Sequence, residues 1–485
     1  MKRLVVVSNR LPALRHTGPG EEIDIPAGGM ASAVFAALRH APESLWVGWH
    51  GRTEPAERVQ RTVRHRAGRL EMVGLPLTQR EVTHYYHGFC NAALWPLFHC
   101  FQGRVRLDLD DESCYRGVQE RFARTLLPLL RPGDLVWVHD YHFLLLAREL
   151  RRRGWRGRIG FFLHIPFPPH DLLELLPDPR DVLEAMLHYD LVGFQVRGSL
   201  DNYVYSCRRE IGARVEDGHL AAAGRAQRVG VYPVGIDPAE FLPPRDGTRR
   251  HQRRGALTRV VRGRRLLLGV DRLDYTKGIP ERILAYEAFL ASHPRWRKHV
   301  SFIQIASPTR TAAAHYLEQK RIVEAIVGRI NGDLAEHDWV PIRYLYRSYP
   351  RATLARFYRE ADVGLVTPLR DGMNLVAKEF VAAQFADSPG VLVLSRTAGA
   401  AEDLPEAVLV NPYIPEDVAG GIARALEMPI GERAERHRAL LERVRRGSIA
   451  EWGRSIVRDL SGAAGPLLEP SRADDRPLRP TAADL

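Results

Sequence analysis

The feature that most constrains this chain is a series of short, almost continuously apolar runs separated by longer amphipathic stretches. Such a run is typical of a strand buried on both faces, as in a parallel sheet. Parallel strands need a crossover connection, usually a helix, between one strand and the next. The series therefore predicts an α/β chain built from strand–helix–strand units. The runs occupy residues 4–7, 135–138, 159–163, 191–194, 266–270, 302–305, 363–366 and 391–394.

The length of 485 residues is too great for one hydrophobic core and predicts two domains. The runs form two series with a boundary near residues 236–240, and repeats at three- and four-residue spacing predict helices at 141–153 and 279–292. We expect one domain over residues 1–236 and another over 237–465, whose last helix is free to pack back on the first. Residues 466–485 lack a core pattern and are expected to be disordered.

The net charge of +12 invites a nucleic-acid interpretation, but the 70 basic residues are scattered through both halves and balanced by 58 acidic ones. A nucleic-acid groove needs clustered charge with interleaved aromatic residues, so we expect no nucleic-acid partner. No stretch reaches the ~18 apolar residues of a membrane span. The short apolar run at residues 4–7 does not resemble a secretion signal, so we expect a cytoplasmic protein without a membrane partner.

Cysteines and histidines show no spacing typical of a metal site, and we expect neither a metal nor a cofactor. The cysteines are predicted to be reduced and packed as small apolar groups. His139, His142 and His170 are interpreted as structural. The cysteines are Cys90, Cys100, Cys114 and Cys207.

Polar side chains follow six of the apolar runs directly. Because ligands in open α/β sheets bind at the carboxyl ends of the strands, these positions predict a polar ligand cleft between the two domains. Arg272 and Lys277 offer a guanidinium fork and a point charge that suit a diphosphate, although a surface pair is the alternative. At residues 371–374 the chain enters a helix whose free N–H groups can hold oxygens, unless Asp371 simply caps it. Glu379 can accept hydrogen bonds from a ribose diol or be a solvated helix residue.

The first half of the chain carries a second set of candidate binding residues. Arg10 follows the first run, and Gly29 lies in a glycine pair where a ligand can approach the backbone closely. Asp140 and His164 follow runs and can bond sugar hydroxyls, although a single histidine after a strand is more often structural. The aromatic segment with Asn91 is either local core or a sugar-stacking wall, and its aromatic members are Tyr85, Tyr86 and Trp95.

Several motifs together resemble the trehalose-6-phosphate synthase family, from about residue 3 to about 460. That family consists of retaining glycosyltransferases with two facing Rossmann-like domains of the GT-B type and the active site in the cleft between them. The motifs are Ser8-Asn-Arg-Leu-Pro12, Leu94-Trp-Pro-Leu-Phe-His99, Trp137-Val-His-Asp-Tyr-His142, Phe162-Leu-His-Ile-Pro-Phe-Pro168, Gly269-Val-Asp-Arg-Leu-Asp-Tyr-Thr-Lys-Gly278, Gly328-Arg-Ile-Asn-Gly332 and Val366-Thr-Pro-Leu-Arg-Asp-Gly-Met-Asn-Leu-Val-Ala-Lys-Glu379.

The resemblance implies transfer of glucose from a nucleotide-glucose donor, usually UDP-glucose, to glucose 6-phosphate, which would give α,α-trehalose 6-phosphate. It implies an acceptor-binding first domain and a donor-binding second domain. The implied donor-binding residues are Gly29, His164, Arg272, Lys277, Asp371, Gly372, Met373, Asn374, Leu375, Val376 and Glu379. The implied acceptor-binding residues are Arg10, Tyr86, Trp95, Asp140 and Arg310. Among these sets, Arg272, Lys277, Asp140 and His164 are the candidate catalytic residues.

The mechanism expected from this set is electrostatic. Negative charge grows on the leaving diphosphate, and fixed cations stabilise it without a metal. The resemblance implies front-face attack, in which the departing phosphate accepts the acceptor's proton. No nucleophilic carboxylate is positioned as in retaining hydrolases.

Several alternatives remain open at this stage. Cys100 and Ser113 stand where many relatives carry Tyr and Trp, which leaves open another phosphorylated acceptor such as glycerol 3-phosphate or a cyclitol phosphate. The donor base (uracil, guanine or adenine) and a possible homo-oligomer are also open. A catalytically silent regulatory or binding protein is a further alternative. The intact set of Arg272, Lys277, Asp371 and Glu379 counts against it.

Overall fold

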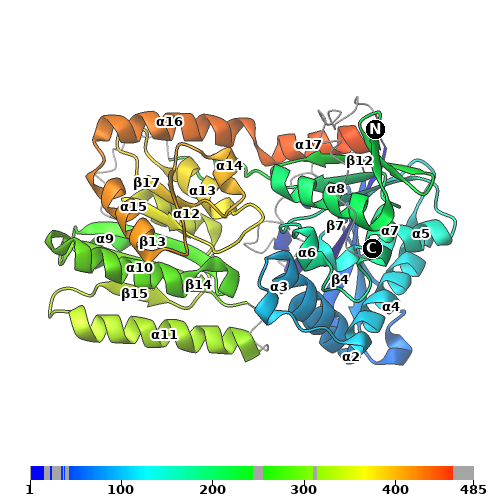
Figure 1. Ribbon diagram of the computed structural model, residues 1–485, viewed down its shortest axis with the longest axis horizontal. Helices are drawn as coiled ribbons and strands as arrows, with labels where there is room; N and C mark the ends of the chain where they lie inside the picture. The colour runs from blue at the N-terminus through cyan, green and yellow to red at the C-terminus, as the bar shows by residue number, and fades with distance from the viewer. Residues whose placement is uncertain are drawn as a thin grey trace, which may run out of the picture.

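The computed structural model describes residues 2–15, 22–24, 34–35, 38, 43–243, 255–309 and 314–462. Gly29, Arg310 and the predicted tail at 466–485 lie outside these residues. The described chain forms two large sheets, each with helices packed against it, and Figure 1 shows them side by side. Within the described ranges, no helix combines the length and the hydrophobicity of a bilayer-spanning segment.

The first sheet has ten strands in the order β10-β11-β12-β9-β8-β7-β1-β4-β6-β5. The strands from β12 to β6 pair in parallel, whereas β5, β10 and β11 are antiparallel edge strands. A separate hairpin joins β2 (Ala13–Arg15) to β3 (Glu22–Asp24). The ten strands are β1 (Leu4–Arg10), β4 (Ser44–Thr53), β5 (Val63–Ala67), β6 (Leu70–Leu77), β7 (Leu135–His139), β8 (Arg158–Phe162), β9 (Leu191–Phe194), β10 (Arg214–Glu216), β11 (His219–Ala222) and β12 (Arg225–Val231).

The second sheet has six strands, all parallel, in the order β15-β14-β13-β16-β17-β18. Its strands are β13 (Arg265–Arg272), β14 (Val300–Ser307), β15 (Ile342–Leu345), β16 (Val363–Val366), β17 (Val391–Ser395) and β18 (Val408–Val410). Each of the eight apolar runs coincides with a strand of the two sheets, apart from Leu163, which follows the end of β8, and the predicted α/β class is confirmed.

The continuous apolar runs are explained by burial on both faces of the sheets. In β1, Val5 and Val7 pack into one hydrophobic cluster, whereas Leu4 and Val6 face another. This second cluster also contains Leu268 of β13, so apolar packing joins the two sheets. All four cysteines are free, as the sequence predicted.

Helices connect the strands as the crossover rule requires. The predicted helix at 279–292 is α10, whereas the prediction at 141–153 divides into a 3₁₀ turn η5 (Tyr141–Phe143) and a shorter helix α5. Helices of the first domain are α2 (Gln79–Glu81), α3 (Trp95–Phe98), α4 (Leu109–Leu126), α5 (Leu146–Arg152), α6 (His170–Leu173), α7 (Pro179–Met186) and α8 (Arg197–Ile211), with a π-helical stretch η2 (Val82–Leu94). Later helices are α9 (Ala256–Val260), α10 (Ile279–Ser292), α11 (Ala314–Leu334), α12 (Arg351–Glu360), α13 (Leu375–Ala383), α14 (Ala400–Asp403), α15 (Pro415–Glu427), α16 (Ile430–Arg446) and α17 (Ile449–Leu460).

The chain crosses between the sheets twice, and the two crossings contact each other. Figure 1 shows α16 above the second sheet and α17 above the first. The Ile449 N–H donates to the Ile236 carbonyl at 2.9 Å. A Cβ on Gly235 would lie 1.8 Å from the Gly447 carbonyl oxygen, so only glycine fits where the crossings meet. The last helix therefore belongs spatially to the first sheet.

Candidate active site

The polar strand ends of the two sheets lie close to each other, and we call the region between them the cleft. A Cβ on Gly372 would lie 2.2 Å from the backbone oxygen of His164, so the helix-entry loop of the second domain touches the first. The Arg272 guanidinium lies over the Trp95 ring, 5.8 Å from its centroid. The structure therefore brings together predicted donor-side and acceptor-side residues from distant parts of the sequence.

Lys277 and Asp371 form an ion pair on the second-domain side of the cleft. Lys277 ends the short turn η8 (Tyr275–Lys277) after β13, and its ammonium contacts the Asp371 carboxylate. The side-chain amide of Asn374 donates to the same carboxylate oxygen at 3.0 Å. Asp371 therefore holds a lysine and an asparagine, and it does not cap the helix as the alternative interpretation supposed.

The entry into α13 leaves its first turn without a side-chain cap. Asn374 is the N-cap residue, with a φ of 83° and no side-chain hydrogen bond to the helix. Its Oδ1 atom is buried and has no hydrogen-bond partner among the described residues. Met373 is buried, and its carbonyl accepts from the Ala400 N–H at 2.7 Å. The loop is thus held by its neighbours while the N–H groups around Leu375 and Val376 stay available for a ligand.

Glu379 lies on the second turn of α13 in a largely buried position. The Tyr358 hydroxyl donates to its Oε2 at 3.1 Å, and the Arg351 guanidinium lies 3.7 Å from its Oε1. Burial raises the pKa of Glu379 to about 7, although Arg351 and Tyr358 act in the opposite direction. Sequence reasoning did not identify Arg351, because nothing near it in sequence indicates that it reaches Glu379.

Aromatic rings dominate the first-domain side. The Arg10 guanidinium, at the end of β1, lies over the Trp49 ring at 5.4 Å, and that ring lies 5.8 Å from Tyr86. The Tyr86 ring in turn stacks on His142 at 6.2 Å. The core interpretation of the aromatic segment is confirmed for Tyr85 and Trp95, which are buried, whereas the sugar-stacking wall stays a prediction. Tyr85 is fully buried core, whereas Tyr86 is half-buried and lies one ring away from Arg10.

Asp140 and His164 lie at adjacent strand ends and contact each other. The Asp140 Oδ1 accepts from the backbone N–H of His164 at 3.2 Å. Asp140 has a φ of 74°, a left-handed conformation that is costly for a residue other than glycine. Such strain is often found at binding sites, where it fixes the direction of a side chain. Burial lowers the pKa of His164 to about 3, so its ring is neutral.

His139 is closer to the site than its structural interpretation implied. Its Nδ1 lies 3.0 Å from Nε2 of His164. Its place at a strand end, directly before Asp140, was a usable sequence signal. Trp452 of α17 also lies near these rings, 6.2 Å from His164, but its position in sequence gave no indication of this.

The residues at the two sequence departures differ in their surroundings. Cys100 is half-buried with a φ of 64°, and burial raises the pKa of its thiol. Ser113 lies on the exposed face of α4. Of the two departures, Cys100 is therefore partly buried, whereas Ser113 is exposed to solvent.

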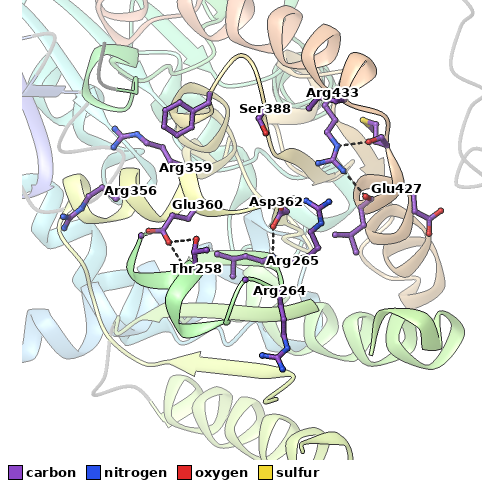
Figure 2. Close-up of a pocket in the computed structure, with 17 residues that line it drawn as sticks. Thr258, Arg264, Arg265, Arg356, Arg359, Glu360, Asp362, Ser388, Glu427 and Arg433 are labelled. Atoms are coloured by element: carbon purple, nitrogen blue, oxygen red, sulfur yellow. Dashed lines mark hydrogen bonds and ion pairs between the residues drawn. The ribbon is translucent and has the colours of Figure 1, made fainter. Parts of the chain in front are cut away.

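A cavity of about 730 Å³ lies at the opposite, amino-terminal end of the second sheet (Figure 2). Figure 2 shows the guanidinium groups of Arg264, Arg356 and Arg433 lying apart from one another. Arg265 pairs with Asp362 at 2.9 Å, and Arg433 donates to backbone carbonyls. The basic groups around this cavity therefore do not converge on a common point.

Three side chains in the first domain lie close enough to hold a metal ion, although the sequence showed no metal spacing. His170 Nε2 lies 3.1 Å from a Glu174 oxygen and 3.5 Å from a Glu210 oxygen. Both carboxylates lie within ion-pair distance of the same ring nitrogen. The contact agrees with the structural interpretation of His170.

Comparison with known proteins agrees with this geometry. The family model for glycosyltransferase family 20 matches residues 2–462. A bifunctional trehalose-6-phosphate synthase/phosphatase of Thermoproteus tenax is 43% identical over 481 residues, which is 97% of this chain. The chain spans 65% of the length of that relative. A trehalose-6-phosphate synthase of Sinorhizobium fredii is 42% identical over 96% of this chain and 99% of its own.

A solved structure shows the same fold. It is the crystal structure of a UDP-forming α,α-trehalose-phosphate synthase from Burkholderia xenovorans in complex with glucose 6-phosphate. It superposes with a TM-score of 0.87 at 39% identity and covers 95% of this chain and all of that one. Together with the facing sheets and the cleft, these matches show that the chain belongs to glycosyltransferase family 20.

Proposed function

We propose that this protein is an α,α-trehalose-6-phosphate synthase that transfers glucose from UDP-glucose to glucose 6-phosphate and releases UDP. The observation that supports this most is the meeting of Lys277, Asp371 and Arg272 with the aromatic, histidine-containing side of the first domain. Relatives that form UDP favour uracil among the bases that the sequence left open, and a relative bound to glucose 6-phosphate favours that acceptor.

On the donor side, Arg272 and Lys277 hold the diphosphate, and the backbone from Asp371 to Val376 holds the glucose and its phosphate. Glu379 accepts from the ribose diol, and His164 bonds the transferred glucose. Lys277 pairs with Asp371, so a bound diphosphate would offer the lysine a second anion and let the carboxylate turn to sugar hydroxyls. This exchange keeps both charged groups hydrogen-bonded before and after binding, which limits the cost of burying them.

On the acceptor side, Arg10 and Tyr86 approach the phosphate, while Trp95 and Asp140 contact the sugar. Arg310, outside the described residues, and Gly29 on the donor side complete the proposed set. The acceptor hydroxyl attacks the anomeric carbon on the face from which the diphosphate leaves. The C–O bond to the diphosphate breaks, and the departing phosphate oxygen takes the hydroxyl proton. The cations stabilise the charge that grows on this oxygen, and the donor's α configuration is retained.

A donor-by-acceptor activity matrix tests this function. UDP-, GDP- and ADP-glucose are each combined with glucose 6-phosphate, glycerol 3-phosphate and an inositol phosphate, and the products are identified by NMR. We expect UDP release and a non-reducing α,α-linked disaccharide phosphate from UDP-glucose and glucose 6-phosphate. A faster reaction with another acceptor would replace the acceptor assignment, and no transfer in any combination would remove the synthase assignment. Cytoplasmic location and homo-oligomerisation stay predictions.

A further inference from the structure

Two neutral histidines of the first domain share a hydrogen bond at the edge of the cleft. His139 is the last residue of β7, and His164 follows the adjacent parallel strand β8, whose Phe162 pairs with His139 in the sheet register. This register places the two imidazoles next to each other, with His139 Nδ1 3.0 Å from His164 Nε2. Only one proton fits between these two atoms, so one ring donates and the other accepts.

The rings around the pair are mainly aromatic. Trp137 lies 4.4 Å from the His139 ring, Phe162 lies 4.8 Å from the His164 ring, and Trp452 flanks both. Burial lowers the pKa of both imidazoles, although the Asp140 carboxylate lies beside them and accepts from the backbone N–H of His164 at 3.2 Å. The pair is therefore neutral near pH 7, and the position of one proton decides what His164 offers to a ligand.

The far nitrogen of His139 indicates which ring donates. His139 is fully buried, and its Nε2 has no hydrogen-bond partner among the described residues. A buried N–H without an acceptor is rare in native structures, and a bare ring nitrogen avoids that orphaned donor. The proton of His139 then lies on Nδ1 and is donated to Nε2 of His164. The proton of His164 consequently lies on its own Nδ1.

We propose that His139 is a positioning residue that holds His164 in the tautomer with its proton on Nδ1, so that His164 donates a hydrogen bond to a hydroxyl oxygen of the transferred sugar. The contact with the sugar rests on the proposed function, whereas the tautomer does not. The arrangement resembles other sites in which the second nitrogen of a functional histidine is fixed by a neighbouring group. Trp452, arriving on α17, closes the apolar wall that keeps water from competing for this hydrogen bond.

Nitrogen-15 NMR of histidine-labelled full-length protein tests the tautomer directly. In the wild-type chain we expect His164 to show a protonated Nδ1 and an unprotonated Nε2, with the resonance assigned by its loss in His164→Asn. In His139→Phe, which keeps a ring but removes the donor, we expect the two nitrogens of His164 to average. In His139→Asn the side-chain amide occupies the place of Nδ1, so the wild-type tautomer should return.

Kinetics of the same variants separate positioning from a merely structural role. We expect kcat of His139→Phe to fall about 10- to 100-fold, the loss typical of outer partners of functional ligands, with the KM for glucose 6-phosphate changed less than about twofold. His139→Asn should recover most of kcat. His188→Phe, which removes a half-buried imidazole bonded to the Glu184 carbonyl at 3.0 Å, is the matched control and should keep wild-type kcat.

The outcomes remain distinguishable from a failure of the proposed function. A wild-type His164 protonated on Nε2 would overturn the tautomer assignment, whatever reaction the protein catalyses. A wild-type tautomer in His139→Phe, or equal kcat in His139→Phe and wild type, would overturn the positioning role. If His139→Phe does not fold, the wild-type spectrum and His139→Asn still decide. No transfer by the wild-type protein would remove only the contact with the sugar.

Discussion

The two sides of the cleft use different physical means to bind a ligand. The second-domain side is ionic, because Lys277 pairs with Asp371 and Arg351 lies near Glu379. The first-domain side consists mainly of aromatic rings and neutral imidazoles, and burial lowers the pKa of His164 to about 3. The difference teaches that the proposed diphosphate site carries paired charges, whereas on the opposite side the charged Arg10 and Asp140 lie among aromatic rings and neutral imidazoles.

Trp452→Ala tests whether α17 stabilises the first-domain side of the cleft. It has the largest expected effect of these variants. The ring packs on Trp137, Phe162 and both histidines, so its removal leaves a large cavity in the first domain. We expect the free energy of unfolding, measured in urea, to fall by about 3–5 kcal/mol. Trp452→Phe keeps most of the contacts and should cost markedly less. Equal stability of Trp452→Ala and wild type would show that α17 does not support the first-domain side.

Lys277→Ala tests the ionic character of the second-domain side. In the proposed function it removes one charge-assisted hydrogen bond to the diphosphate, about 1.5–3 kcal/mol, and should lower the transfer rate about 10- to 150-fold. Steady-state UDP release measures the change. Lys298→Ala removes a lysine from an exposed pair with Glu336 and should leave the rate unchanged. Wild-type turnover in Lys277→Ala would contradict a role in holding the diphosphate.

Arg10→Ala tests whether the charge on the first-domain side serves binding alone. Arg10 is exposed and lies over Trp49, so we expect its guanidinium to hold the acceptor phosphate equally before and during transfer. Such uniform binding affects KM and not kcat. We expect the KM for glucose 6-phosphate to rise roughly 10-fold, consistent with an exposed charge-assisted bond. Arg64→Ala, at a surface pair with Glu71, is the control. A fall in kcat as large as that of Lys277→Ala would erase the contrast between the two sides.

The pH dependence of donor binding tests Glu379 and has the smallest expected effect. Because burial raises the pKa of Glu379 to about 7, the carboxyl is mostly protonated at pH 6 and mostly ionised at pH 8. The ionised form accepts from a ribose diol, so the donor Kd should fall as pH rises through 7. With the ionised fraction rising from about one-tenth to nine-tenths, the affinity gain is at most ~10-fold. Calorimetry with wild type and Glu379→Gln measures it, and an identical slope in both proteins would assign the dependence to another group.

Much of the fold could be predicted because local patterns report burial directly. A strand buried on both faces must be apolar at consecutive positions, as β7 and β13 are. By contrast, the strand β4 was not predicted. Its apolar residues are followed by the polar end His50-Gly-Arg-Thr53, and it was not among the eight apolar runs. The predicted helix at 141–153 was wrong in its first turns, since the strained backbone at Asp140 leads into a 3₁₀ turn.

The sequence by itself determined the α/β class, the two series of strands and the polar residues at their ends, because each of these depends on short-range periodicity. Only the tertiary structure decided which of those residues touch. The register of β7 with β8 places His139 on His164, the return of α17 brings Trp452 behind them, and α12 brings Arg351 to Glu379. These contacts join residues from separate elements, so no local pattern encodes them. They form because sheet register, helix packing and the second chain crossing bring these elements together.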